Sequence, residues 1–203
     1  MNLLNKYFPE LKEDKLNTYR DFREVFSKWN EKINCVSRKD MENFEERHIL
    51  HSLAISKVIS FPKGSSVLDV GTGGGFPGLP LAIMFPEVQF HLIDSIGKKI
   101  KVVQGLVDEL ELKNVKATKI RSEEIKEKYD FITARAVARA TTFFHWVGHL
   151  KNNKSPYEKQ GIYYLKGGDI KEEMLELKRP FKIWPISDFF EEEFFETKKV
   201  VHF

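Results

Sequence analysis

The feature that most constrains this chain is a short apolar run that stops at a cluster of glycines. Residues 67–78 read VLDVGTGGGFPG. Glycine tolerates positive φ and lets the backbone approach a ligand closely. The free N–H groups at the start of a following helix favour a polar or anionic ligand, and Pro77 suits a first helical turn because it has no N–H that needs a partner there. The segment therefore predicts a buried strand, a ligand-binding turn and a helix.

Short apolar runs alternate with helical patterns along the rest of the chain. Strands are predicted at residues 67–70, 90–93, 115–120, 131–134 and 162–165, and helices at residues 78–85, 98–110, 136–150 and 169–177. Alternation of this kind implies βαβ units and a mostly parallel sheet. After Phe181, two last strands surround the acidic, aromatic connection 188–197, and we expect these strands to pair antiparallel at a sheet edge.

The first 60 residues are different, because their patterns are helical. Apolar side chains recur at spacings of three and four between residues 16 and 29. A second helical pattern runs from about residue 40 to residue 59, and the Phe-Pro-Lys-Gly at residues 61–64 then breaks the chain. We therefore expect an N-terminal helical extension over residues 1–63 and an α/β core over residues 64–203.

Composition excludes several kinds of protein and site. The 203 residues are 41% hydrophobic and 13% aromatic, enough for a core, and a net charge of +3 does not by itself indicate a nucleic-acid binder. The single cysteine, Cys35, excludes an internal disulfide and a cysteine-rich zinc site, and the six histidines are scattered, so we expect no metal site. With no signal-peptide pattern and no long apolar stretch, we expect a cytoplasmic protein without a membrane partner.

Two cofactor classes use a strand, glycine turn and helix of this kind. Gly73, Gly75 and Gly78 spell the G-x-G-x-x-G of dinucleotide-binding sites, which is a weak match alone. Residues 67–75 also fit the apolar-apolar-Asp-apolar-Gly-x-Gly-x-Gly pattern typical of class I S-adenosylmethionine methyltransferases, with Asp69 before the first glycine. The second pattern is favoured, and a tight turn without a ligand is the remaining alternative.

Asp94 supports an adenosine ligand. It ends the second predicted strand, 19 residues after Gly75, and a carboxylate there can accept hydrogen bonds from both hydroxyls of an adenosine ribose. Dinucleotide enzymes place an acid at the same point, so Asp94 does not choose between the cofactors. It is also placed to cap the helix that begins near Gly97, and the two roles are compatible.

A longer run, LDVGTGGGFPGLPLAIMFPEVQFHLIDSIGKK at residues 68–99, resembles the bacterial 16S ribosomal RNA guanine-N7 methyltransferases (methyltransferase G, or glucose-inhibited division protein B). Further elements agree in order and spacing: WNEKIN at 29–34, ERHILHSL at 46–53, RSE at 121–123, TARAVA at 133–138 and LKG at 165–167. One residue departs from the family, since His51 stands where the second element usually has Asp. If that acid packs against Arg47, its loss needs compensation.

The resemblance implies the class I methyltransferase fold: α/β, with a Rossmann-like, mostly parallel sheet, an antiparallel last strand and an N-terminal helical extension. It implies S-adenosyl-L-methionine as cofactor and N7 of a guanine in 16S ribosomal RNA, or in a small ribosomal subunit particle, as methyl acceptor. Carried over residue by residue, the cofactor contacts fall on Gly71, Phe76, Ser122, Glu123 and Arg135, and Asp94 adds the ribose contact expected of class I enzymes.

The absence of two motifs disfavours two other kinds of base methylation. Methylation of cytosine C5 needs a cysteine late in the fold, but Cys35 precedes the glycine turn, and residues 133–136 read TARA where enzymes acting on adenine amines usually carry (N/D)-P-P-(Y/F/W). Guanine N7 has an in-plane lone pair and no proton, so in-line attack needs orientation and no general base. We therefore expect no catalytic acid–base residue. A methyltransferase acting on a small molecule or a protein is the first alternative, and a non-catalytic dinucleotide- or RNA-binding module is the second.

Basic residues are expected to flank an RNA-facing mouth. The residues predicted for this role are Lys28, Lys32, Arg47, His48 and Arg135. Solvated helix faces are the alternative for the lysines. Arg135 can bind the methionine carboxylate, a phosphate or the guanine, or it can hold a structural salt bridge, and the sequence does not choose among these.

Overall fold

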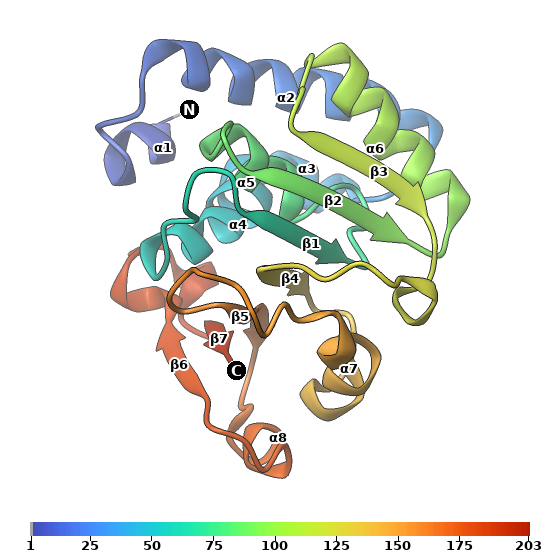
Figure 1. Cartoon of the computed structure of the whole chain (residues 1–203). Coiled ribbons are helices and arrows are strands. Elements are labelled where there is room, and N and C mark those ends of the chain that lie inside the picture. Colours follow the sequence, from blue (N-terminus) through green and yellow to red (C-terminus); the bar gives the residue numbers. More distant parts are fainter. Residues whose placement is uncertain (1) are drawn as a thin grey trace.

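The centre of the computed structural model, which describes residues 2–203, is a seven-stranded sheet in the order β3-β2-β1-β4-β5-β7-β6 (Figure 1). The strands are β1 (Ser66–Val70), β2 (Gln89–Asp94), β3 (Val115–Lys119), β4 (Phe131–Arg135), β5 (Gly161–Gly167), β6 (Lys182–Pro185) and β7 (Lys198–His202). Strands β1 to β5 pair in parallel, and β7 pairs antiparallel with both β5 and β6. The predicted mostly parallel sheet and the antiparallel pairing of the last two strands are confirmed.

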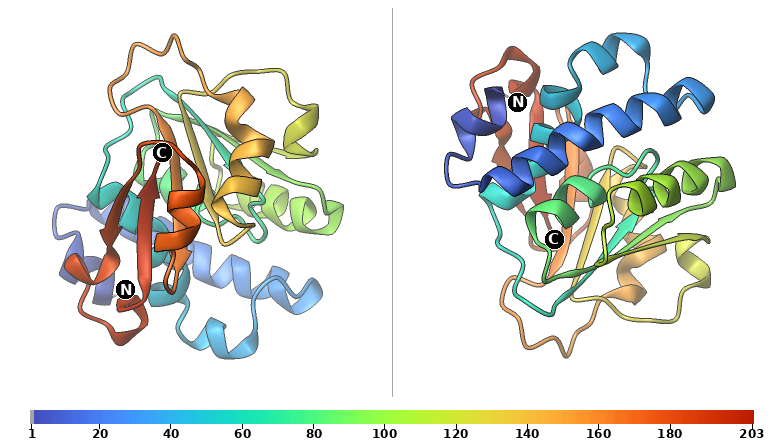
Figure 2. Two further views of the ribbon diagram at one scale, coloured as in Figure 1. Left: turned by 90° about the horizontal axis from the view of Figure 1, so that it is seen from below. Right: turned by 90° about the horizontal axis from the view of Figure 1, so that it is seen from above.

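Helices cover both faces of the sheet, which gives three layers (Figures 1 and 2). One face carries α2 (Glu13–Lys32), α4 (His51–Leu53), α5 (Gly78–Met84) and α6 (Gly97–Glu109); the other carries α7 (Ala140–Val147) and α8 (Lys171–Glu176). The N-terminal region also contains α1 (Asn2–Tyr7) and α3 (Arg38–Glu42), of which α1 was not predicted. Short 3₁₀ turns are Ala54–Lys57, Ser122–Glu124, Gly148–Leu150, Ile186–Asp188 and Glu193–Phe195. Between residues 2 and 203, no helix combines the length and apolarity that a bilayer span needs.

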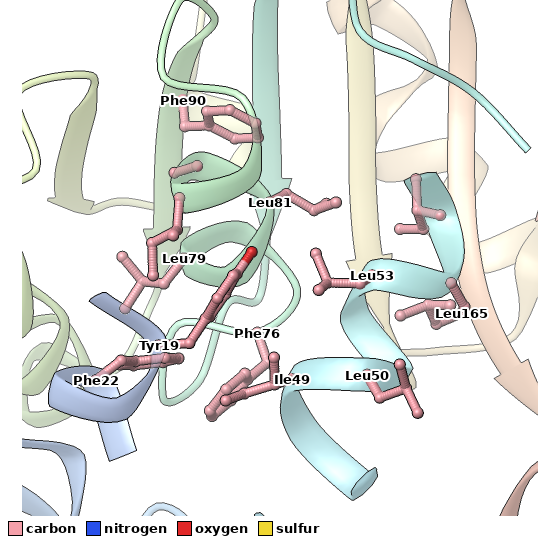
Figure 3. Packing of buried hydrophobic residues seen from close by; sticks show 14 of the residues in the cluster. Tyr19, Phe22, Ile49, Leu50, Leu53, Phe76, Leu79, Leu81, Phe90 and Leu165 are labelled. Atoms are coloured by element: carbon pink, nitrogen blue, oxygen red, sulfur yellow. The ribbon is translucent and has the colours of Figure 1, made fainter. Parts of the chain in front are cut away.

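The N-terminal helices and the sheet share one hydrophobic cluster. Successive residues of β4 face opposite sides, with Phe131 in this cluster and Ile132 in the second cluster beneath α7 and α8. Tyr19 and Phe22 of α2 pack toward Phe76, the residue that follows the glycine turn (Figure 3). The rings of Phe22 and Phe76 are 5.7 Å apart, and the buried Tyr19 hydroxyl donates to the Pro80 carbonyl at 2.8 Å. Packing of α2 therefore fixes the position of the glycine turn.

Two predicted helices differ in the structure. Residues 40–59 do not form one helix, because α3 ends at Glu42 and a π-helix (Glu45–Leu50) precedes α4. The helix predicted over residues 136–150 begins only at Ala140, since Ala136 has a φ of 51° in the left-handed region, which ends the regular backbone after β4. Both irregular segments border the candidate functional site.

Candidate functional site

The glycine turn after β1 uses backbone conformations that only glycine adopts without strain. Gly71 and Gly73 have φ values of 67° and 58°. A Cβ atom on Gly71 would lie 2.8 Å from Val137 Cγ2, whereas one on Gly73 would meet nothing within 4 Å. Gly71 therefore allows the segment after β4 to pack against the turn, and Gly73 faces open space.

Asp69 supports the turn from beneath. It is fully buried; Oδ1 accepts a hydrogen bond from Thr133 Oγ1 at 3.0 Å, and Oδ2 accepts one from the Gly78 N–H at 3.2 Å. These bonds tie β1 to β4 and to the first residue of α5. Burial raises the pKa of Asp69 to about 6, because desolvation opposes the carboxylate more than its hydrogen bonds favour it.

Because the pKa of Asp69 is raised, we expect the stability of Asp69→Asn relative to the wild type to increase as pH rises. The folded chain binds the Asp69 proton more tightly than the unfolded chain, so this group's stabilisation is complete below the ordinary carboxyl pKa and is lost as pH rises through about 6. Asparagine can accept from Gly78 and donate to Thr133, and it carries no charge. In thermal melts, the Tm of the variant minus the Tm of the wild type should increase by several degrees from pH 5 to pH 8. A difference independent of pH would contradict this account.

A cavity of about 600 Å³ lies at the carboxyl ends of β1 and β4. In the strand order β1 and β4 are neighbours with crossovers leading away on both sides, so the cavity is at the switch point where open α/β sheets bind ligands. Its volume is that of a small-molecule site. The structure brings all six predicted cofactor residues to its wall, together with His48, which like Arg135 was predicted to face RNA: Gly71, Phe76, Asp94, Ser122, Glu123, Arg135 and His48.

Asp94 connects the glycine turn to the loop before α6. Its Oδ2 accepts from the Gly73 N–H at 3.1 Å and its Oδ1 from the Ile96 N–H at 2.8 Å, while Lys99 Nζ is 3.9 Å from Oδ2. Asp94 was predicted as a possible cap of α6, but the N-cap of that helix is Ile96, so this prediction is wrong. Each carboxylate oxygen keeps further lone-pair capacity, so the group can still accept from ribose hydroxyls.

The residues after β3 form another part of the wall. Ser122 is buried and its hydroxyl donates to Glu123 Oε2 at 2.9 Å, while Glu123 itself is exposed. Trp146 of α7 also lines the cavity and was not predicted. Ser122 therefore orients an acceptor carboxylate at this wall.

Arg135 lies at the end of β4 and reaches the N-terminal helices. Nη1 donates to the Arg47 carbonyl at 3.2 Å and Nη2 to His48 Nδ1 at 3.1 Å, and the guanidinium lies 4.8 Å from the Phe76 ring centre. None of the ion pairs within residues 2–203 includes Arg135, so the structural salt bridge considered above is not formed. Burial lowers its pKa to about 10, which leaves it charged at neutral pH. The cavity wall therefore carries a cation that forms no direct ion pair within residues 2–203, although the charges of Asp69 and Asp40 favour its protonated form.

The other predicted RNA residues do not line the cavity. Lys28 and Lys32 are exposed near the end of α2, where Lys32 Nζ lies 5.4 Å from the Trp29 ring. Arg47 is partly buried, with its guanidinium 5.5 Å from the Phe194 ring of the acidic connection. The five predicted residues are thus divided, with His48 and Arg135 at the cavity and three outside it.

Arg47 has an acidic partner in the structure, although His51 stands where the family element usually has Asp. Asp40 pairs with Arg47 at 2.8 Å (Nη1 to Oδ1), and its other oxygen accepts from the Ser37 hydroxyl at 2.7 Å. An acid from α3 therefore pairs with Arg47. His51 is buried with Phe194 at 5.5 Å, and desolvation lowers its pKa well below the usual value, so the ring is neutral.

Residues of the N-terminal extension close the cavity and were missed in the sequence. Cys35, Val36, Ser37 and Asp40 line it. Asn30 holds this loop: its Oδ1 accepts from the N–H groups of Cys35 and Val36 at 2.8 and 2.9 Å, and its Nδ2 donates to the Val36 carbonyl at 2.8 Å. The WNEKIN element, which contains Asn30, ends one residue before Cys35 and was the available signal.

Together these features define a class I S-adenosylmethionine-dependent methyltransferase. Open space over Gly73 suits the close approach of that cofactor, and free acceptor capacity at Asp94 suits its ribose. The Arg135 guanidinium, which forms no direct ion pair within residues 2–203, suits its carboxylate. The fold is similar to a SAM-dependent methyltransferase from Aquifex aeolicus (TM-score 0.58, 14% identity, covering 82% of this chain and 98% of that one). It is also similar to precorrin-6y C5,15-methyltransferase from Geobacter metallireducens (TM-score 0.56, 7% identity, 83% and 90%).

Sequence comparison defines the family. The family model described as GidB, rRNA small subunit methyltransferase G, matches residues 15–199. Curated proteins named ribosomal RNA small subunit methyltransferase G are 54% identical in Christiangramia forsetii and 52% identical in Flavobacterium johnsoniae, over all of this chain and 96% and 97% of theirs. The chain therefore belongs to the rRNA small subunit methyltransferase G family. The resemblance drawn from the motifs, the fold class and the cofactor are confirmed.

The single thiol offers a direct test of where the cofactor binds. Cys35 lines the cavity and is partly exposed, and burial raises its pKa. Saturating S-adenosylhomocysteine should slow alkylation of Cys35 at least fivefold by covering it, whereas NAD at the same concentration should not. Labelling of the urea-unfolded chain, which should be equally fast with either compound, is the control. Equal rates for the folded chain with and without S-adenosylhomocysteine would show that the cofactor binds elsewhere.

Proposed function

We propose that this chain transfers the methyl group of S-adenosyl-L-methionine to N7 of a guanine in 16S ribosomal RNA, in the cytoplasm where ribosomes are built. The observation that carries the proposal is the composition of the cavity wall. The residues that the family resemblance assigns to the cofactor line this cavity, and the N-terminal extension adds Cys35, Val36, Ser37, Asp40 and His48 to its wall. The relatives named as rRNA small subunit methyltransferases support RNA as the acceptor.

The wall offers orientation rather than a general base. His48 accepts from Arg135, and Asp40 is engaged by Arg47 and Ser37. These groups are held by protein partners, which suits an acceptor atom without a proton to remove. Guanine N7 is such an atom, and its in-plane lone pair can attack the sulfonium methyl that the bound cofactor supplies. Catalysis by positioning can lower a barrier by about 7–11 kcal/mol in favourable cases.

The proposal gives the predicted cofactor residues definite contacts. Asp94 accepts from the ribose hydroxyls, and Glu123, oriented by Ser122, accepts from the adenine amino group. Gly71 and Gly73 let the backbone approach, and Phe76 supports the plane of the guanidinium above it. Arg135 binds the methionine carboxylate, which gives this cation a direct ion pair.

We propose the extension, residues 1–63, as the RNA-facing part and residues 64–203 as the methyltransferase core, with Arg47 also facing the RNA. Replacing both Lys28 and Lys32 by Gln should weaken binding to 16S rRNA and reduce the slope of log K against log salt by up to about 2, because each phosphate contact releases counterions. Affinity for S-adenosylhomocysteine should not change.

The control for this prediction is a pair of lysines at the end of the sheet where the parallel strands begin. Lys154 and Lys159 lie in the loop that leads into the amino end of β5. Their replacement by Gln removes the same charge and should leave the salt slope unchanged. Salt-independent RNA binding by the wild type would contradict phosphate contacts on this surface.

Mapping of 7-methylguanosine in small-subunit rRNA, with and without the gene, tests the proposed function. One modified guanine should disappear on deletion and return when the wild-type chain is supplied. The purified chain should then methylate naked 16S rRNA or a small-subunit particle, and not 23S rRNA. An unchanged modification map, or equal turnover on small molecules without RNA, would overturn the proposal.

A further inference from the structure

The contact between His48 and Arg135 determines which tautomer His48 adopts. Arg135 Nη2 lies 3.1 Å from His48 Nδ1. A guanidinium can only donate hydrogen bonds, so Nδ1 must accept and must be unprotonated. The ring proton is therefore on Nε2, which is buried and has no partner among residues 2–203.

The surroundings of His48 keep its ring neutral. Besides Arg135 from β4, the charged groups that face it are Asp40 from α3 and Arg47 from its own element. Desolvation, followed by the Arg135 charge, lowers the pKa of His48 to about 3, and the opposing effect of Asp40 is smaller. A protonated ring would place two cations in contact. His48 is thus a neutral acceptor throughout the physiological range.

Three surfaces hold the pair in place. The Phe76 ring centre is 4.8 Å from the His48 ring and 4.8 Å from the Arg135 guanidinium, and Phe44 lies 5.5 Å from His48 on another side. The π-helix (Glu45–Leu50) supplies both acceptors, the His48 ring and the Arg47 carbonyl at 3.2 Å from Nη1. Both acceptors are uncharged, so they orient the guanidinium without neutralising it.

We propose that His48 is a positioning residue that orients the Arg135 guanidinium toward the cofactor cavity and leaves its charge for the methionine carboxylate. This role rests on the proposed contact between Arg135 and the cofactor. It differs from the direct RNA contact predicted from the sequence, because here His48 acts through Arg135. An RNA phosphate is the other anion that Arg135 can bind, and the experiment separates the two.

The experiment compares His48→Leu with His48→Asn. Leucine fills the space without an acceptor, whereas the Oδ1 of asparagine stands close to the position of Nδ1. By calorimetry without RNA, His48→Leu should bind S-adenosylhomocysteine about tenfold more weakly, and His48→Asn less than threefold. Both variants should bind 5′-methylthioadenosine, which lacks the amino-acid carboxylate, as well as the wild type does.

A double-mutant cycle shows whether His48 acts through Arg135. In an Arg135→Ala background, His48→Leu should cause no further loss of S-adenosylhomocysteine affinity, since coupled residues are not additive. Additive losses, or an equal loss for 5′-methylthioadenosine, would overturn the proposal. A His48 variant whose RNA binding falls while its S-adenosylhomocysteine affinity stays constant would also overturn the proposal. That result would mean that the Arg135 charge binds an RNA phosphate.

A measurement on the folded wild type covers the case in which His48→Leu does not fold. The ¹⁵N spectrum of the imidazoles, assigned with His48→Asn, should show His48 neutral and protonated on Nε2 from pH 5.5 to pH 8. Arg135→Ala should shift the Nδ1 signal. A ring that titrates above pH 5.5, or one protonated on Nδ1, would contradict the proposal. None of these measurements uses methyl transfer, so a failure of this proposal can be distinguished from a failure of the proposed function.

Discussion

Gly71→Ala is expected to weaken S-adenosylhomocysteine binding at least tenfold and to remove methyl transfer at ordinary cofactor concentrations, while the chain still folds. The new side chain would be strained at a φ of 67°, and its Cβ would lie 2.8 Å from Val137 Cγ2. Either the turn or Val137 must then move, and both line the cavity. Calorimetry and thermal melts measure the two effects separately.

Gly168→Ala is the matched control for the backbone strain. Gly168 has a φ of 76°, and a Cβ there would meet nothing within 4 Å. It follows β5, is exposed and does not line the cavity. Both variants carry the strain of a left-handed residue, roughly 1–2 kcal/mol, but only Gly71→Ala has a clash at the site. Equal loss of affinity in both variants would show that the contact with Val137 is not what matters.

The part of the site on the sheet could be predicted from the sequence. The glycine turn and Asp94 are local patterns at the ends of β1 and β2, and parallel strands bring their carboxyl ends to one edge. Ser122 follows β3, and Arg135 is the last residue of β4, so the same rule places them at this edge. The strand pattern therefore places these residues at one edge of the sheet, whereas the choice of Gly71, Phe76, Ser122, Glu123 and Arg135 as cofactor contacts came from the family resemblance.

The wall contributed by the N-terminal extension could not be predicted in this way. The position of Cys35 depends on how α2 packs, through Phe22 against Phe76, and on the clamp by Asn30. Asp40 reaches Arg47 from seven residues earlier in the chain, across a break between helices. Contacts of this kind are set by tertiary packing and leave no periodic pattern in one sequence.

The irregular backbone at the site has the same origin. Apolar periodicity over residues 40–59 is helical, yet the Arg47 carbonyl accepts from Arg135 within a π-helix that periodicity does not distinguish from an α-helix. Ala136 takes a left-handed conformation next to a segment whose Val137 and Ala138 N–H groups donate to the Tyr164 hydroxyl at 2.9 and 2.8 Å. Long-range bonds fix both departures from regular helix, which is why the predicted helices extended too far.

Asp94→Ala should produce the largest loss of cofactor affinity of any single carboxylate in the cavity, roughly 100-fold for S-adenosylhomocysteine. The variant loses the acceptors for two ribose hydroxyls, and hydrogen bonds to a charged group are worth about 1.5–3 kcal/mol each. It also leaves the Gly73 and Ile96 N–H groups without their present acceptor. Asp94→Asn should lose about tenfold, because its amide has one acceptor oxygen and places a donor against one of these N–H groups.

Asp169→Asn separates the ligand contact from the local turn. Asp169 Oδ1 accepts from the Lys171 N–H two residues later at 3.0 Å, as Asp94 Oδ1 does from Ile96, but Asp169 is exposed before α8 and away from the cavity. Calorimetry should show wild-type affinity for Asp169→Asn and the graded losses for the two Asp94 variants, with 5′-methylthioadenosine weakened as strongly as S-adenosylhomocysteine because both contain the ribose. A loss confined to S-adenosylhomocysteine would place Asp94 at the amino-acid end of the cofactor and contradict the ribose contact.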